Sequence, residues 1–169
     1  HRKRQCPVRH RSPDNSRRGT TGQYRRAAER CTAMKSLTVP AETDQLETVL
    51  SFIHDELKNA SCSEEVLFQV NVAVEEIFVN IAHYAYASSK GDATVLCQTG
   101  GCPLQVMIEF QDSGIPYNPL SRPDPDLTLS AEERQVGGLG IYMVKQMMDS
   151  VSYEYRDGKN ILTILKTVA

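Results

Sequence analysis

Two pairs of short apolar segments, each joined by a glycine-containing turn, constrain the fold of this chain most strongly. Segments 94–110 and 151–166 each contain two apolar runs, separated by glycines at 100–101 and at 158. Alternating apolar and polar residues are typical of a strand with one buried face, and glycine permits a tight hairpin turn. We therefore predict two antiparallel hairpins, with strands at 94–99, 104–110, 151–156 and 160–166.

Upstream of the hairpins, apolar residues recur every three or four positions, which predicts two helices. A short strand at 36–39 precedes the first helix, whose N-cap is predicted to be Thr43 or Asp44. The second helix starts at the capping-box spacing of Ser61–Glu64 and runs to about Tyr86. Its predicted buried stripe comprises Val66, Val70, Ala73, Val74, Ile77, Ile81 and Ala85.

A long segment rich in Pro, Asp and Ser, 112–136, follows the first hairpin, and a third helix is predicted at 141–149. So long a loop inside a compact domain is usually functional, for example as a lid. The element order is strand, two helices, hairpin, loop, helix and hairpin. This order predicts an α+β fold of two layers, in which helices cover one face of the sheet.

Charge divides the chain into two parts. Residues 1–33 carry ten Lys or Arg against two Asp or Glu, a net charge of +8, whereas residues 34–169 carry nine against nineteen, a net charge of −10. We expect 1–33 to be a disordered tail and 34–169 to be the functional domain. The tail has three interpretations: a basic arm for nucleic acid or anionic surfaces, a stretch translated upstream of the natural start, or a cloning remnant.

Composition also limits the setting in which the chain works. No run approaches the roughly 18–20 consecutive apolar residues of a membrane-spanning helix, so we expect no membrane association. Five widely spaced cysteines are an odd number, which favours a reducing, cytoplasmic compartment over a disulfide framework.

The first candidate site lies on the second predicted helix. Glu76 and Asn80 are four residues apart and so share one helix face, and His83 follows on the same side. A carboxylate beside an amide oxygen suits Mg²⁺ or the activation of a hydroxyl, because Mg²⁺ prefers hard oxygen ligands. A solvated helix face is the alternative.

The second candidate site follows the apolar strand 104–110. In the segment 112–119, Asp112 and Gly114 precede Pro116 and Asn118. An aspartate at a strand end can accept a hydrogen bond from a ligand, and a glycine lets the ligand approach the backbone. Ordinary turn chemistry is the alternative, because Asp, Gly, Pro and Asn are the common turn residues.

The third candidate site is the glycine cluster 137–140 at the start of the third helix. Free backbone N–H groups and the positive end of the helix dipole attract phosphate there. Loop flexibility is the alternative. Neither a Rossmann nor a Walker glycine pattern is present, and protein-kinase motifs are absent.

The order of the three sites is more specific than any one of them. Glu76-x-x-x-Asn80, then Asp112-x-Gly114-x-Pro116, then a long loop and Gly137-Gly138-Leu139-Gly140-Ile141 resemble the N, G1 and G2 boxes of the Bergerat-fold (GHKL) ATPases. The small anti-sigma regulatory factors with serine/threonine kinase activity are most similar, over essentially 34–169. The resemblance implies the Bergerat fold, a two-layer sandwich with a mixed, mostly antiparallel sheet.

The resemblance also implies a role for each motif residue, with ATP and Mg²⁺ as cofactors. Asn80 would ligate Mg²⁺, and Glu76 would be the catalytic base. Asp112 would accept a hydrogen bond from the adenine amino group, and Gly114 would let the base lie against the chain. The remaining cofactor-binding residues are expected to be His83, Pro116, Asn118, Arg134, Gly137, Gly138, Leu139 and Gly140, with 119–136 as the lid.

Two positions depart from the family pattern. Many relatives have a His four residues after the N-box Asn, where this chain has Tyr84, preceded by His83. Relatives also have an Arg close before the second glycine box. Arg134 lies three residues before Gly137, so both Arg134 and Lys145 are candidates for the cation at the terminal phosphate.

The function that the resemblance implies is phosphorylation of a serine or threonine on an anti-anti-sigma (STAS-type) partner, with control of sigma-factor availability. A homodimer is implied in the same way, and direct nucleic-acid binding is not expected. Two alternatives stay open: a nucleotide-gated protein-binding module without kinase activity, and an ATP hydrolase or histidine-kinase-like catalytic domain.

Overall fold

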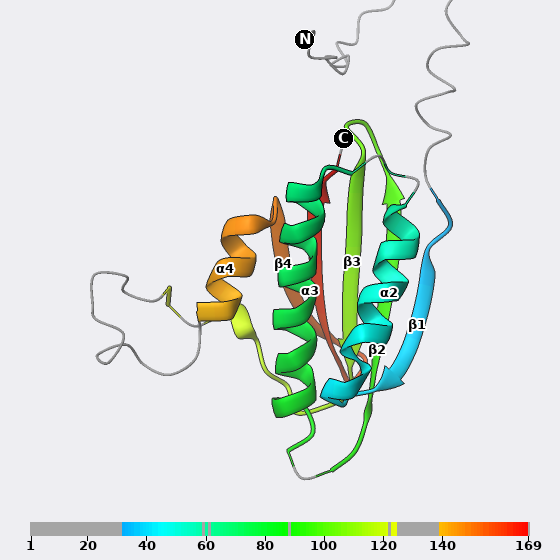
Figure 1. The fold of residues 1–169 in the computed structure, drawn as a ribbon. Coiled ribbons are helices and arrows are strands. Elements are labelled where there is room, and N and C mark those ends of the chain that lie inside the picture. Colours follow the sequence, from blue (N-terminus) through cyan, green and yellow to red (C-terminus); the bar gives the residue numbers. More distant parts are fainter. Residues whose placement is uncertain are drawn as a thin grey trace, which may run out of the picture.

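Five strands form a single sheet in the computed structural model, which describes residues 32–58, 60, 62–87, 89–121, 123–124 and 139–168. Their order is β1-β2-β3-β5-β4, and every described pairing is antiparallel (Figure 1). Both predicted hairpins are confirmed, as β2–β3 and β4–β5. The strands are β1 (Lys35–Pro40), β2 (Asp92–Gly100), β3 (Gln105–Asp112), β4 (Ser150–Arg156) and β5 (Lys159–Thr167).

Helices cover one face of this sheet. The two long helices, α2 (Leu46–Leu57) and α3 (Glu64–Tyr84), lie on it and run roughly along the strands, and α4 (Leu139–Met147) packs beside α3 (Figure 1). Short 3-10 turns precede α2, as η1 (Thr43–Gln45), and follow β3, as η2 (Pro119–Ser121). The predicted two-layer α+β architecture is confirmed, with all three helices of the described residues on the same side.

The hydrophobic core lies between the helices and the sheet. Val74 and Ile77 on α3 belong to the same core cluster as Phe110 on β3, and each of the three is at most 1% exposed. Phe78, fully buried, was not part of the predicted stripe. The stripe assumed one narrow contact face, but α3 contacts α2, α4 and the sheet, which buries a wider arc of the helix.

The helix starts differ from those predicted. Neither Thr43 nor Asp44 caps α2: the N-cap is Gln45, the last residue of η1, which makes no side-chain capping bond. For α3 the N-cap is Ser63, whose Oγ accepts a hydrogen bond from the backbone N–H of Val66 at 3.2 Å. The predicted N-cap Ser61 was therefore wrong: Ser63, two residues later, caps the helix, because a serine at either position can offer the same side-chain oxygen.

Helix α3 is long and apolar enough to span a membrane when only length and composition are counted, with a mean hydropathy of 1.2 over 18 residues. The sequence showed no uninterrupted apolar run because polar residues interrupt the segment. A core helix of a soluble protein meets the same criterion. The inner side of α3 supplies Val70, Ala73 and Val74 to the core described above.

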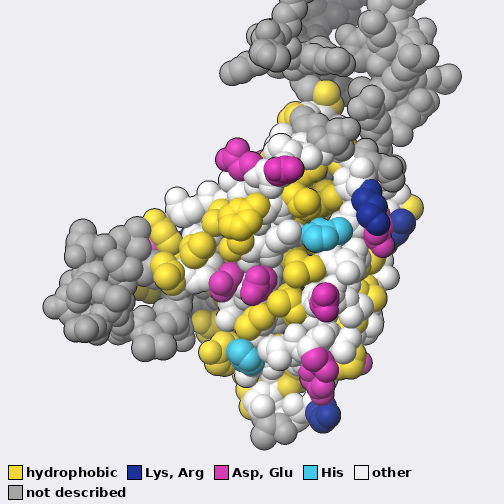
Figure 2. All heavy atoms as spheres, viewed as in Figure 1, with side chains coloured by type: hydrophobic (Ala, Val, Ile, Leu, Met, Phe, Trp, Pro, Cys, Tyr) yellow, Lys and Arg dark blue, Asp and Glu magenta, His cyan; other side chains and the backbone are white. Residues whose placement is uncertain are grey.

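The outer surface of the helical layer carries more acidic than basic side chains. Figure 2 shows Asp and Glu spread over this face, with a few Lys and Arg near its margin. Phe68 on α3 is the most exposed phenylalanine of the described residues, at 62%. A single exposed aromatic residue is normal on a protein surface, so it calls for no separate explanation.

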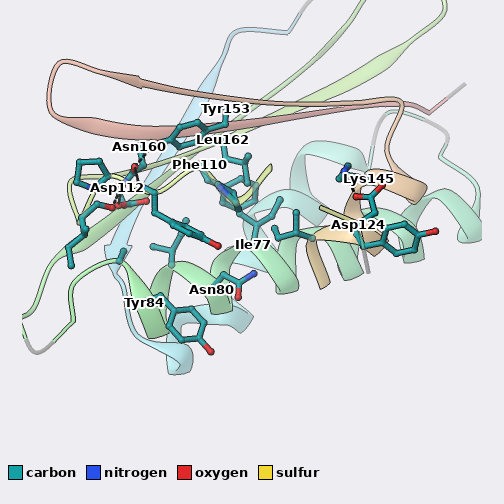
Figure 3. A pocket seen from close by; sticks show the side chains of 18 of the residues that line it. Ile77, Asn80, Tyr84, Phe110, Asp112, Asp124, Lys145, Tyr153, Asn160 and Leu162 are labelled. Carbon is teal, nitrogen blue, oxygen red and sulfur yellow. Dashed lines mark hydrogen bonds and ion pairs between the residues drawn. The ribbon is translucent and has the colours of Figure 1, made fainter. Parts of the chain in front are cut away.

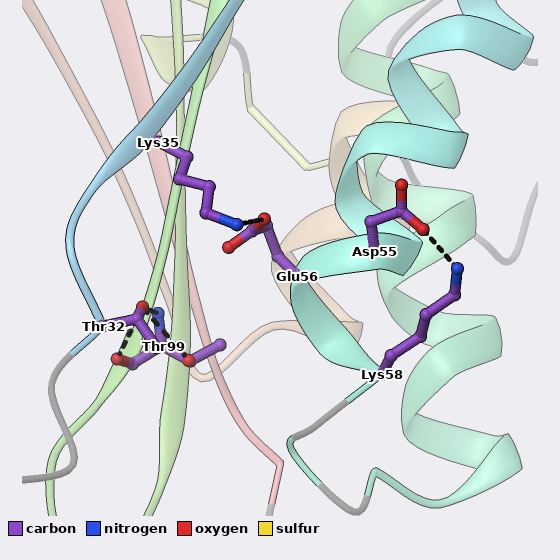
Figure 4. A network of polar contacts seen from close by, with 6 residues as sticks. All are labelled: Thr32, Lys35, Asp55, Glu56, Lys58 and Thr99. Atoms are coloured by element: carbon purple, nitrogen blue, oxygen red, sulfur yellow. Dashed lines mark hydrogen bonds and ion pairs between the residues drawn. The ribbon is translucent and has the colours of Figure 1, made fainter.

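Contacts with the sheet begin at Thr32, before β1. The backbone N–H of Thr32 donates to the carbonyl of Thr99 on β2 at 2.8 Å, and its Oγ1 accepts from the N–H of Thr99 at 3.0 Å (Figure 4). Nearby, Lys35 pairs with Glu56 at 2.7 Å, and this hydrogen bond raises the pKa of Lys35 above its ordinary value. The predicted tail lies outside the described residues, except for 32–33.

The turn between β4 and β5 shows why glycine was informative. Asp157 and Gly158 both have positive φ, of 54° and 77°, as a two-residue type I′ hairpin requires. Asp tolerates this left-handed conformation better than most residues, and Gly adopts it without steric cost. This turn sets the register in which β5 pairs with β4.

Candidate functional site

A cavity of about 510 Å³ opens between α3, α4 and the ends of β3 and β5 (Figure 3). Its volume lies within the roughly 300–1,000 Å³ of typical small-molecule sites. Apolar side chains form much of the wall, and polar ones reach it from several elements, among them Asn80 on α3, Asp112 on β3, Lys145 on α4 and Asn160 on β5. The cavity therefore joins the N-box asparagine to the strand-end aspartate, as the sequence predicted.

Asp112 is the most buried acidic residue of the cavity wall, at 6% exposed. Its Oδ1 accepts two hydrogen bonds, from the backbone N–H of Gly114 at 2.9 Å and from Nδ2 of Asn160 at 2.8 Å. Its Oδ2 has no partner among the described residues. Since none of their buried side-chain oxygens lacks a partner, Oδ2 is not fully enclosed, and Asp112 lines the cavity. One carboxylate oxygen is thus anchored, and the other can accept a hydrogen bond from a ligand.

Asn160 is the main site residue that sequence reasoning missed. It pairs with Asp112 in the β3–β5 register and is 7% exposed. Side chains of paired residues on adjacent strands lie on the same face of the sheet. The available signal was the alternation of β5, which places this polar residue on the inner face with Leu162 and Ile164. A buried amide needs specific hydrogen-bond partners, so an Asn on the inner face indicates a polar site.

The loop after β3 is held against the end of α3. The N–H of Ile115 donates to the carbonyl of Ala85 at 2.8 Å, and a Cβ on Gly114 would lie 2.2 Å from that same carbonyl oxygen. Gly114 is therefore required by the fold itself; its effect on ligand approach stays a prediction. Tyr86 adds a second clamp, because its hydroxyl accepts from the N–H of Ser113 at 2.9 Å and donates to the carbonyl of Asp92 at 2.6 Å.

On α3 the two adjacent glutamates differ in exposure. Glu75 is exposed, whereas Glu76 and Asn80 are half-buried. Asn80 lines the cavity, and Glu76 is not among its lining residues. The carboxylate of Glu76 lies against the first turn of α4, where a Cβ on Gly140 would come within 1.9 Å of Oε2. The structure thus brings Glu76, Asn80 and the start of α4 together.

Part of the predicted phosphate site lies outside the described residues, namely Arg134, Gly137 and Gly138. Leu139, at 46% exposed, and the half-buried Gly140 begin α4. Of the two predicted cations, Lys145 lines the cavity and forms an ion pair with Asp124, which belongs to the predicted lid (Figure 3).

Two further predicted residues do not line the cavity. His83 is exposed, and its ring meets that of Tyr84 edge-to-face, with centroids 5.8 Å apart; Tyr84 itself does line the cavity. Asn118 is also exposed, and its Oδ1 accepts from the N–H of Leu120 at 2.9 Å within η2. Pro116, by contrast, belongs to the wall. The ligand contacts predicted for His83 and Asn118 stay predictions.

A metal ion at this cavity would depend on few protein ligands. Among the described residues no three His, Cys, Asp or Glu side chains come together as a metal cage. Asn80 supplies a hard amide oxygen at the wall. One protein ligand together with phosphate oxygens of a nucleotide is a common way to hold Mg²⁺, so the donor set fits a Mg²⁺–nucleotide complex.

Comparison with known proteins gives consistent matches. The family model described as a histidine kinase-like ATPase domain matches residues 39–166. The serine/threonine-protein kinase BtrW of Bordetella bronchiseptica is 30% identical over 104 residues, which are 60% of this chain and 71% of BtrW. The serine-protein kinase RsbW of Bacillus cereus is 20% identical over 128 residues, which are 75% of this chain and 80% of RsbW.

A solved structure shares the fold. It contains the RsbU and RsbW domains of a Mycobacterium tuberculosis protein and matches with a TM-score of 0.57 at 16% identity. The match covers 81% of this chain but only 33% of the solved one, so this chain spans about a third of that protein. At this identity the likeness concerns the fold alone.

Proposed function

Because the chain belongs to the histidine kinase-like (GHKL) ATPase domains, and among them to the anti-sigma serine/threonine kinase family, we propose that it is an ATP-dependent regulator kinase. It transfers the terminal phosphoryl group of ATP to a serine or threonine of an anti-anti-sigma (STAS-type) partner and controls the availability of a sigma factor. One observation carries this proposal: Asp112 and Asn80 reach a single cavity whose far side is formed by α4.

The adenine end of the nucleotide is assigned to Asp112. The accessible Oδ2 accepts a hydrogen bond from the exocyclic amino group of adenine, while the apolar wall formed by residues such as Phe110 and Leu162 contacts the ring. A guanine would present a carbonyl oxygen at the same point, and two acceptors repel. The geometry of the carboxylate therefore supports selection of adenine nucleotides.

The phosphate end is assigned to Asn80, Lys145 and the start of α4. The Asn80 side-chain oxygen would hold the Mg²⁺ of the nucleotide, and this ion would neutralise phosphate charge. Free N–H groups in the first turn of α4 face the phosphates, and the Lys145 ammonium contributes positive charge to the same wall. Nucleotide binding would have to compete with Asp124 for Lys145.

Glu76 is assigned the role of general base. It accepts the proton of the attacking hydroxyl as that oxygen bonds to the terminal phosphorus and the bond to the leaving oxygen breaks. Its half-buried position beside the α4 start supports this role, whereas the exposed Glu75 faces solvent. Positioning and charge supply most of the acceleration in phosphoryl transfer, so the protein needs no covalent intermediate.

Transfer of labelled phosphate from ATP to candidate STAS-type partners tests the proposal. We expect transfer by the full chain and a loss of roughly 10²–10⁴-fold with Glu76→Gln, the usual contribution of a general base. Glu75→Gln is the matched control and should retain transfer. Nucleotide binding without transfer to any partner would instead support the nucleotide-gated binding module, and release of phosphate without a partner would support a hydrolase.

A further inference from the structure

We infer that Asn160 is a positioning residue that sets the base selectivity of the cavity by fixing the Asp112 carboxylate, an inference that rests on the proposed function. Asn160 lies on β5 and Asp112 on β3, so the two are brought together only by the pairing of these strands. The Nδ2 group of Asn160 donates to Oδ1 of Asp112 at 2.8 Å. Both side chains are at least nine-tenths buried.

The Asn160 amide has one orientation because all of its hydrogen-bonding capacity is used. Nδ2 donates to Asp112 and to the carbonyl of Ile115 at 3.1 Å. Oδ1 accepts from the N–H of Tyr117 at 3.1 Å and from the hydroxyl of Tyr153 at 2.7 Å. Two donors and two acceptor positions are the full complement of an Asn side chain. If the amide were flipped, its oxygen would face the acceptors of Asp112 and Ile115, and its NH₂ would face the N–H of Tyr117.

This fixed amide in turn fixes the carboxylate. Oδ1 of Asp112 receives one N–H from Asn160 and one from Gly114, so both hold the same oxygen. Rotation of the carboxylate would break both bonds, and Oδ2 remains the oxygen that a ligand meets. A base with an amino group can donate to Oδ2, whereas a base with a carbonyl cannot. Loss of the Asn160 amide would free the carboxylate to rotate and to be hydrated.

Tyr153 on β4 extends this network by one residue. Burial raises the pKa of its hydroxyl, so the group stays protonated and donates to Oδ1 of Asn160. Tyr153 also lines the cavity, next to Asn160 (Figure 3). Removing its hydroxyl leaves Oδ1 of Asn160 with the N–H of Tyr117 alone. Removal of the Tyr153 hydroxyl should therefore loosen the Asp112 carboxylate in the same way as removal of the Asn160 amide, but to a smaller extent.

Calorimetric titration with ATP and with inosine triphosphate, which has a carbonyl in place of the adenine amino group, tests this role. We expect the wild-type chain to prefer ATP by about tenfold or more, as expected when one hydrogen bond to a charged group is lost. Asn160→Leu keeps a similar volume, and we expect it to reduce ATP affinity about tenfold with little change for inosine triphosphate. Tyr153→Phe should shift the ratio of the two affinities by roughly threefold, the size expected of a weaker, indirect effect.

Asn71→Leu is the matched control, because Asn71 bonds His54 between α2 and α3 at 2.7 Å and is not part of the cavity wall. Its ratio of ATP to inosine triphosphate affinity should equal that of the wild type. An unchanged ratio in Asn160→Leu, even with both affinities lowered, overturns the inference. If that variant does not fold, an unchanged ratio of ATP to inosine triphosphate affinity in Tyr153→Phe overturns the inference instead. A wild-type chain that binds neither nucleotide contradicts the proposed function itself, and the inference fails with it.

Discussion

The carboxylate of Glu76 lies where a side chain on Gly140 would have to be. A Cβ built on Gly140 comes 1.9 Å from Oε2 and 2.7 Å from Cδ of Glu76, so the first turn of α4 contacts the acidic group on α3 directly. Helix starts expose N–H groups and the positive end of the helix dipole, which favours a carboxylate at this point. The position of Glu76 therefore depends on the position of α4.

Replacement of Gly140 with Ala should displace the Glu76 carboxylate. Ala favours helix over Gly by up to about 1 kcal/mol, and the atoms that its Cβ would meet form the end of a flexible side chain. We expect the free energy of unfolding in urea to change by less than about 1 kcal/mol. Phosphate transfer should fall by roughly 10²–10⁴-fold, as it would without the base. Transfer at the wild-type rate would contradict the role given to Glu76.

Replacement of Asp112 with Asn should change which base the cavity accepts. The new amide oxygen can still accept from Gly114 and Asn160, and this orientation turns its NH₂ towards the cavity. ATP affinity should fall by about 1–3 kcal/mol, because a donor would then face the adenine amino group. Affinity for inosine triphosphate should fall less or rise. Calorimetry with both nucleotides measures the difference, and equal losses would argue against direct reading of the base.

Replacement of Gly114 with Ala should destabilise the fold, in contrast to the change at Gly140. The added Cβ would lie 2.2 Å from the backbone oxygen of Ala85, and backbone cannot rotate away as a side-chain end can. Overpacking of this kind costs about 1–3 kcal/mol, which urea unfolding would detect. ATP affinity should fall as well, because a shift of the backbone at residue 114 would displace the N–H that donates to Asp112. An unchanged free energy of unfolding would show that the loop after β3 can move away from Ala85 at little cost.

Cys97 should be chemically inert in the folded protein. Burial, with the nearby Glu56 carboxylate as a further cause, raises the pKa of its thiol from 9.0 to about 12, and only the thiolate reacts with alkylating agents. At pH 8, iodoacetamide should label the exposed Cys102 and leave Cys97 unmodified, as peptide mass spectrometry can show. Rapid labelling of both would mean that β2 opens readily.

The same pKa shift predicts how stability depends on pH. Because the thiol of Cys97 ionises at lower pH in the unfolded chain than in the folded one, its contribution to stability is complete below about pH 9. The contribution is lost as the pH rises from there towards 12. Cys97→Ala should remove this part of the alkaline loss of stability, measured by urea unfolding at several pH values. An identical pH dependence in the variant would contradict the prediction.

Local patterns in the sequence determined the elements of the fold and the order of its motifs. Alternation predicted both hairpins, helical spacing predicted α2 and α3, and the glycine cluster 137–140 marked the start of the third helix, all in the observed order. The resemblance to the GHKL boxes placed Asn80 and Asp112 in one pocket, where the structure has them. These signals were sufficient because strand and helix periodicity reports directly which side of an element is buried. The predictions of the N-cap residues were wrong, because neighbouring polar side chains could cap the helices equally well.

Only the tertiary structure decided which side chains complete the site. Asn160 meets Asp112 across 48 residues of sequence because β5 returns between β3 and β4, and no spacing along the chain encodes that neighbour. The contact between Glu76 and Gly140 likewise comes from the packing of α4 on α3. Tyr84 rather than His83 lines the cavity, because the last turn of α3 directs Tyr84 towards it. Periodicity is a property of one element, whereas a binding site is made where several elements meet.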